Sequence, residues 1–116
     1  MTFTDVIATT ELRALYDAHI GTPSAWQVHP LLMPLMGDPE GLPAGRSELQ
    51  RQRAMEGFMR VDGRSVLDIG ANTGYFSLAA IERGARRVVS QEGDAGHAEF
   101  LQSAARLLDV GDRLTV

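Results

Sequence analysis

The segment Ser65–Ser77 constrains the fold of this chain most, because it predicts a strand, a glycine-bearing turn and a helix in succession. Residues Arg64–Ile69 begin polar and become a short apolar run, which is typical of a parallel strand covered by helices on both faces. Gly70 and Gly74 permit positive φ angles and a close approach by a ligand. Free amides at the start of the helix favour polar or anionic ligand groups. The apolar helical pattern ends at Gly84, where a C-cap glycine belongs.

Acidic residues lie at the ends of two predicted strands. The carboxylate of Asp68 can cap the amides of the turn, bind a ligand, or do both. Glu92 follows the second predicted strand, Arg87–Gln91, and lies 18 residues after Gly74. In βαβ nucleotide-binding folds, an acid about 20 residues after the glycines binds ribose hydroxyls. The alternative is a solvated loop charge, but the position at the end of a strand favours the ligand role.

The rest of the C-terminal half continues the alternation of strands and helices. Asp94 is the expected N-cap of a helix whose apolar stripe runs to Leu108. A third strand is expected to begin at Arg113–Val116. This order predicts an α/β, Rossmann-like parallel sheet with right-handed crossovers.

The residues Val66–Gly74 resemble the first motif of class I S-adenosylmethionine-dependent methyltransferases, and Glu92 matches the acid that ends their second strand. The residues Asp68–Ser77 are also similar to the motif of the FkbM-type branch of the family. Asn72 stands where many family members have a second glycine, and this branch tolerates asparagine there. In the family, the glycine loop approaches the methionine part of the cofactor and the strand-two acid binds both ribose hydroxyls. The acid at the position of Asp68 helps to hold the loop and the amino end of the cofactor. The resemblance covers about residues 60–116.

The resemblance implies methyl transfer from S-adenosylmethionine as the function, with alignment of donor and acceptor supplying much of the rate. No residue is assigned as a catalytic base. The methyl acceptor is undetermined. The resemblance to the FkbM-type motif favours a small molecule or a sugar as the acceptor. The residues expected at the cofactor are Asp68, Gly70, Ala71, Asn72, Thr73, Gly74, Tyr75, Phe76, Glu92 and Gly93.

Two alternative functions remain open from the sequence. An NAD-type oxidoreductase would have G-x-G-x-x-G after the first strand, and the spacing of Gly70 and Gly74 disagrees with it. A non-catalytic Rossmann-like module that binds a partner is the other alternative. No phosphate-binding Gly-Lys-Ser/Thr sequence is present, and no metal site is expected because the three histidines lack ligand spacing.

Composition excludes several other classes. The net charge of −4 is evenly divided, because residues 1–60 carry 5 Arg and 7 acids while residues 61–116 carry 6 Arg and 8 acids. A basic nucleic-acid-binding face is therefore not expected. The absence of cysteine rules out disulfides and thiolate chemistry within these 116 residues. No apolar run reaches the roughly 20 residues of a membrane span and no signal peptide is evident, so a cytoplasmic location is expected.

Residues 1–60 are expected to form a helical and irregular N-terminal extension to a domain at residues 61–116. An amphipathic helix is predicted at Leu12–Ile20, and a capping box at Ser47–Gln50 predicts another. The turn-rich segment Thr22–Gly45 is expected either to cover the core or to act as a lid. Within it, His29 is considered as a base near the acceptor.

The domain at residues 61–116 is expected to be the first half of an S-adenosylmethionine-binding domain. Family members have a seven-stranded sheet, so a truncated half with three strands, inactive by itself, is expected. In the strand order 3-2-1-4, the first strand would lack its neighbour. Its open edge at Val66–Leu67 predicts a homodimer or a domain swap through strand pairing.

Overall fold

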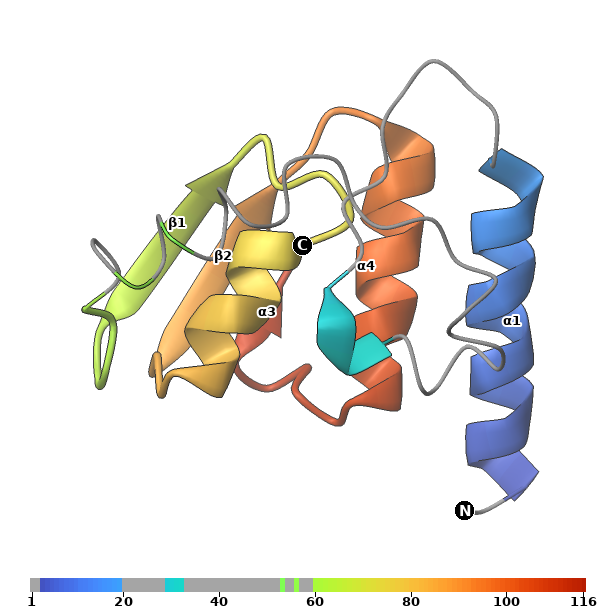
Figure 1. The fold of residues 1–116 in the computed structure, drawn as a ribbon, viewed down its shortest axis with the longest axis horizontal. Helices are drawn as coiled ribbons and strands as arrows, with labels where there is room; N and C mark the ends of the chain where they lie inside the picture. Colours follow the sequence, from blue (N-terminus) through green and yellow to red (C-terminus); the bar gives the residue numbers. More distant parts are fainter. Residues whose placement is uncertain (1–2, 20–28, 33–52, 54–55, 57–59) are drawn as a thin grey trace.

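The structure is a computed structural model that describes residues 3–19, 29–32, 53, 56 and 60–116 (Figure 1). Its elements alternate between helix and strand in the C-terminal half, as predicted. In chain order they are α1 (Phe3–His19), the 3-10 turn η1 (Pro30–Leu32), β1 (Ser65–Ile69), α3 (Tyr75–Glu82), β2 (Arg87–Gln91), α4 (Ala95–Leu107) and β3 (Leu114–Thr115).

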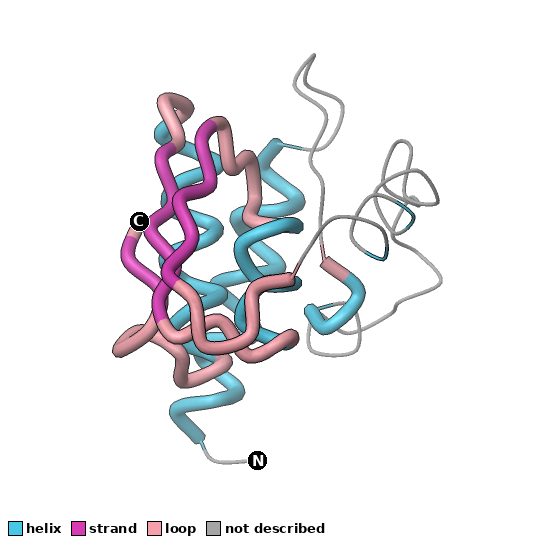
Figure 2. The backbone as a smooth tube through the Cα atoms, turned by 90° about the vertical axis from the view of Figure 1, so that its left-hand side faces the viewer, coloured by secondary structure: helices cyan, strands magenta, loops and turns pink. Residues whose placement is uncertain are grey.

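The three strands form one parallel sheet in the order β1-β2-β3. Ser65 lies opposite Arg87 and Ile69 opposite Gln91, so β1 and β2 end together at one edge of the sheet. The strands make one layer and the helices lie beside it in Figure 2. This confirms the predicted α/β, Rossmann-like fold, with β1 at the edge of the described sheet.

The two faces of the sheet have different environments. Alternate residues of a strand point to opposite faces, and Val88 and Ser90 of β2 are buried. On the opposite face Leu67, Ile69 and Val89 are 60%, 72% and 38% exposed. The prediction that helices cover both faces of the first strand is therefore wrong for the described residues. The apolar run indicated a strand but did not indicate which face the helices cover.

The core lies between the sheet and the helices. α3 packs against β1 and β2, and α1 packs against α4. Leu12 and Tyr16, one turn apart on α1, are buried in the same cluster as Phe100 and Leu101 of α4 and Val88 of β2. The first helix thus shares its core with the C-terminal half, and the proposed boundary at residue 60 stays a prediction.

Local signals set the ends of α3 and α4. The carboxylate of Asp94 accepts a hydrogen bond from the backbone N–H of His97 at 3.0 Å, which confirms the predicted N-cap of α4. Gly84 directly follows the C-cap residue of α3 and has a φ of +92°, as expected for a residue that ends a helix.

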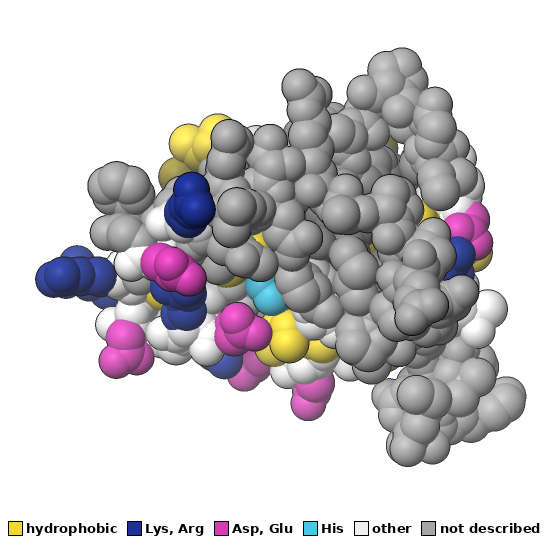
Figure 3. All heavy atoms as spheres, viewed as in Figure 1, with side chains coloured by type: hydrophobic (Ala, Val, Ile, Leu, Met, Phe, Trp, Pro, Cys, Tyr) yellow, Lys and Arg dark blue, Asp and Glu magenta, His cyan; other side chains and the backbone are white. Residues whose placement is uncertain are grey.

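The N-terminal extension is described only in part. Its first helix begins at Phe3, earlier than predicted, and ends at His19. The capping box and most of the turn-rich segment lie outside the described residues, except His29–Leu32. In the described ranges, no helix combines the length and apolar character needed to cross a bilayer. Acidic and basic side chains lie interspersed on the described part of the face in Figure 3.

Candidate cofactor site

The loop between β1 and α3 depends on three residues with left-handed backbone. Gly70, Asn72 and Gly74 have φ angles of +71°, +55° and +91°. A Cβ on Gly74 would lie 2.2 Å from Cδ1 of Leu101 in α4, whereas a Cβ on Gly70 would meet nothing within 4 Å. Gly74 is therefore needed for both its backbone angle and close packing. Gly70 is needed for its angle and faces open space.

Asn72 occupies the position at which the methyltransferase motif often has glycine. Asparagine tolerates the left-handed region better than other non-glycine residues. Its side-chain Oδ1 accepts a hydrogen bond from the backbone N–H of Thr73 at 2.7 Å. This local bond stabilises the turn, so the departure from the glycine pattern has a structural explanation.

The backbone amides of the loop donate within the chain. Gln91 at the end of β2 lies beside the loop because its strand pairs in parallel with β1. Each of the five amides of residues 70–74 already has an acceptor, so these loop amides are engaged within the chain. The acceptors are the Gln91 carbonyl for Gly70 (2.8 Å) and Ala71 (3.1 Å), the Glu92 carboxylate for Asn72, the Asn72 side chain for Thr73, and the Ala71 carbonyl for Gly74 (2.9 Å). The expectation of free amides concerned the start of the helix, which begins at Tyr75, and it stays a prediction.

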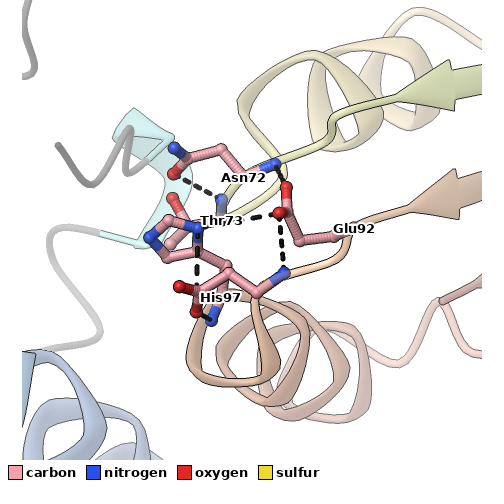
Figure 4. A network of polar contacts seen from close by, with 5 residues as sticks. Asn72, Thr73, Glu92 and His97 are labelled. Atoms are coloured by element: carbon pink, nitrogen blue, oxygen red, sulfur yellow. Dashed lines mark hydrogen bonds and ion pairs between the residues drawn. The ribbon is translucent and has the colours of Figure 1, made fainter. Parts of the chain in front are cut away.

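Glu92 joins the loop to the start of α4 (Figure 4). Its Oε2 accepts the bond from the Asn72 N–H, and its Oε1 accepts from the Asp94 N–H at 3.1 Å. The side chain is only 13% exposed, so the alternative of a solvated loop charge is wrong. An ionised carboxylate has about four acceptor positions. Two therefore remain for the hydroxyls of a ligand.

His97 is a site residue that the sequence analysis missed. Its Nδ1 lies 3.9 Å from Oε1 of Glu92 and 4.0 Å from Oδ1 of Asp94. Its ring is buried, as its place in the apolar stripe of α4 predicts. The available signal was its position three residues after an N-cap aspartate, in the first turn of a helix that follows a strand-end acid.

Asp68 lies at the carboxyl end of β1 and points to the covered face of the sheet. Its Oδ2 accepts a hydrogen bond from the Ser77 hydroxyl at 2.6 Å. Burial raises the pKa of Asp68 above its usual range, and the nearby charge of Glu92 also raises it. Hydrogen bonds from the hydroxyl and backbone N–H of Ser77 lower the pKa and offset part of this effect. Asp68 is thus a half-buried acid tied to the first turn of α3.

Tyr75 and Phe76 begin α3 and lie next to the N-terminal extension. The ring of Tyr75 is buried, with its centroid 5.2 Å from that of His29 and 5.5 Å from that of Phe76. His29 accepts the Leu31 N–H at Nδ1, at 3.1 Å. A neutral imidazole that accepts at Nδ1 carries its proton on Nε2. In this arrangement the Nδ1 atom of His29 is engaged by the backbone, and a role for His29 as a base stays a prediction.

Gly93 and Thr73 complete the set of residues expected at the cofactor. Gly93 is exposed and a Cβ there would meet nothing within 4 Å, so the end of β2 is open to a ligand. Oγ1 of Thr73 is buried without a hydrogen-bond partner in the described part of the chain. Within that part, no group of three or more His, Cys, Asp or Glu could hold a metal ion.

This chain is similar to solved structures of methyltransferases. The crystal structure of PRMT6–SAH aligns with 56% of this chain at 29% identity and a TM-score of 0.50. Phosphoethanolamine N-methyltransferase 1 of Haemonchus contortus, solved with phosphoethanolamine and S-adenosylhomocysteine, aligns with 99% at 18% identity and a TM-score of 0.54. The chain has a methyltransferase fold. The aligned part of this chain spans only 19% and 22% of the lengths of these two proteins. No family description and no curated protein matches the sequence.

Proposed function

We propose that this chain forms the S-adenosylmethionine-binding half of a class I methyltransferase. The observation that carries the proposal is the contact between Glu92 and the loop. Its carboxylate is held at the carboxyl end of the sheet, against Asn72, and it retains acceptor positions for two hydroxyls. Both hydroxyls of a ribose can bind such a group, as in the family that the motif resembles.

The other contacts follow from where the loop is open. The methionine part of the cofactor is proposed to lie along Gly70, where no atom of the chain would meet a Cβ. Its ammonium group is proposed to bind the carboxylate of Asp68. When bound, S-adenosylmethionine supplies a methyl group that passes to a nucleophile as its carbon–sulfur bond breaks. The described residues position the cofactor, and none is proposed as a catalytic base.

The loop amides favour this ligand over a dinucleotide. A dinucleotide fold places its pyrophosphate on free amides at the glycine turn and the helix start. Here all five amides of residues 70–74 donate within the chain. S-adenosylmethionine has no phosphate and does not need them. The NAD-type alternative therefore lacks free glycine-turn amides for its pyrophosphate.

The acceptor and the branch of the family rest on the sequence motif alone. We propose a small-molecule or sugar acceptor and an FkbM-type relationship because the residues Asp68–Ser77 resemble the motif of that branch. Comparing methyl transfer to sugar hydroxyls with methyl transfer to arginine-containing peptides, in the full-length protein, tests this choice. Transfer to the peptide alone would contradict it.

Calorimetric titration with S-adenosylhomocysteine, with NADH in parallel, tests the cofactor assignment. We expect binding of S-adenosylhomocysteine only. Glu92→Ala should weaken it about 10- to 100-fold, because hydrogen bonds to a charged acceptor contribute about 1.5–3 kcal/mol. Glu99→Ala, which removes an exposed carboxylate of α4, is the matched control and should leave the affinity unchanged. Binding of NADH, or of neither compound, would refute the proposal.

A further inference from the structure

Two buried serines connect Asp68 to the neighbouring elements. Ser77, in the first turn of α3, donates from its hydroxyl to Oδ2 of Asp68 at 2.6 Å. The hydroxyl oxygens of Ser77 and Ser90 are also 2.6 Å apart. Ser90 lies on β2 directly opposite Asp68 in the strand register. The relative exposures of the two serines are 0% and 3%, so bulk water cannot replace either partner.

The direction of this chain of hydrogen bonds follows from the number of protons. An ionised carboxylate only accepts, and each hydroxyl has one proton to donate. The Ser77 hydroxyl therefore donates its one proton to Asp68 and accepts a hydrogen bond from the Ser90 hydroxyl. Hydrogen bonds in such a series polarise one another. The Ser90 hydroxyl thus strengthens the bond from Ser77 to the carboxylate.

We propose that Ser77, supported by Ser90, is a positioning residue that keeps the Asp68 carboxylate ionised and oriented toward the ammonium group of the cofactor. This inference rests on the proposed function, because it assigns the cofactor as the ligand of Asp68. It adds two residues, from α3 and β2, that lie outside the glycine loop and do not need to touch the cofactor.

The surroundings of Asp68 act on its protonation in opposite directions. Burial and the carboxylate of Glu92 both favour the neutral form of Asp68, and Ser77 opposes them. On α3 the only ionisable side chains are Tyr75 and, at the far end, Glu82. On α4, His97 faces Glu92 at 3.9 Å. Among the groups acting on the pKa of Asp68, those that lower it both belong to Ser77.

A purely structural role is a weaker account of the serine pair. Both residues lie where the neighbouring positions of the core are apolar, such as Val88 and Leu78. Burying hydroxyls has a desolvation cost that apolar side chains of similar size do not have. The pair is nevertheless placed at the carboxyl end of the sheet, against an acid that its hydrogen bonds stabilise.

The test compares Ser77→Ala, Ser77→Thr and Ser90→Ala with the wild type. Ser103→Ala removes a buried serine of α4 whose hydroxyl accepts from Arg106 instead, and it is the matched control. Carbon-13 NMR titration of the Asp68 carboxyl group in the free protein measures its pKa directly. Calorimetry with S-adenosylhomocysteine from pH 4.5 to 8.5, a window of about four units around the usual carboxyl and histidine range, measures binding.

We expect Ser77→Ala to raise the pKa of Asp68, because it removes the donor that favours the ionised form. An ammonium ligand needs the ionised form, so affinity falls as the pH drops through this pKa. In Ser77→Ala the fall should begin at a higher pH, and affinity at pH 6 should be about 10-fold lower. Ser77→Thr should restore both values, and Ser90→Ala should shift them less in the same direction.

Different failures separate the two proposals. Binding by Ser77→Ala with an unchanged Asp68 titration and an unchanged pH profile would overturn the role of Ser77 alone. If Ser77→Ala does not fold, the other two serine variants decide. An unchanged Asp68 titration and pH profile in Ser90→Ala, together with values in Ser77→Thr that differ from those of the wild type, would overturn the role of Ser77. Absence of binding by the wild type at every pH would overturn the proposed function and, with it, the assigned ligand of Asp68.

Discussion

The carboxylate of Glu92 accepts a hydrogen bond from the backbone N–H of Asn72, a residue 20 positions earlier in the chain. This bond connects the end of β2 to the loop after β1. It places an acid beside a turn whose amides are already engaged and leaves acceptor positions on the carboxylate. Such a site suits hydroxyl groups better than phosphate, which is why we propose a nucleoside-type cofactor without a pyrophosphate.

Substitution of the loop glycines should reduce stability in a fixed order. Gly74→Ala combines a left-handed φ with a clash against Leu101 and should lower the free energy of unfolding by about 2–4 kcal/mol. Gly70→Ala has only the backbone cost of about 1–2 kcal/mol. Gly111→Ala, at an open position without a positive φ, should change it by less than about 0.5 kcal/mol. Urea denaturation measures all three, and equal effects at Gly70 and Gly74 would contradict the packing argument.

The N-cap of α4 provides a second stability prediction. Asp94→Ala removes the acceptor of the His97 N–H and should lower the free energy of unfolding by about 1 kcal/mol. Asp112→Ala removes an exposed carboxylate before β3 and should have little effect. Thermal denaturation followed by circular dichroism distinguishes them. A similar loss in both variants would point to net charge rather than to capping.

The raised pKa of Asp68 predicts a dependence of stability on pH. Its pKa is raised in the folded state, so its contribution to stability is fully present below the unfolded pKa and is lost as the pH rises through the folded pKa. Asp68→Asn replaces the carboxyl group by an amide that stays neutral at every pH, so the variant does not lose this contribution to stability. It should therefore unfold at a higher urea concentration than the wild type at pH 7. The two proteins should converge in acid. A less stable Asp68→Asn protein at pH 7 would contradict this sign, and Asp109→Asn, at an exposed position, controls for charge.

The open edge of β1 predicts self-association, which we propose as a homodimer. Among the described strands, β1 and β3 each pair on one side only, but β1 is the longer edge and its residues Leu67 and Ile69 are exposed on the uncovered face. Leu67→Lys should prevent pairing by adding an edge charge. Thr115→Lys, on the exposed side of β3, should not. Sedimentation velocity measures the mass, and a strictly monomeric wild type at high concentration would refute the dimer.

Local features of the sequence determined the elements and their ends. Arg87–Gln91 was predicted as a strand with the bounds observed, and Asp94 and Gly84 marked helix ends correctly. These features depend on the conformational preferences of a few adjacent residues, which are the same in any fold. The strand–glycine–helix pattern with a second strand-end acid also predicted the Rossmann-like fold and brought Asp68 and Glu92 forward as site residues.

Only the tertiary structure decided how these residues are used. The bond from Ser77 to Asp68, the bond between Ser77 and Ser90 and the capture of loop amides by Gln91 join positions far apart in the chain. They exist because β1 and β2 pair in one register and α3 packs on one face of the sheet. The same packing leaves Leu67 and Ile69 exposed. Neither spacing nor composition contains the register or the covered face, since both result from contacts formed when the elements assemble.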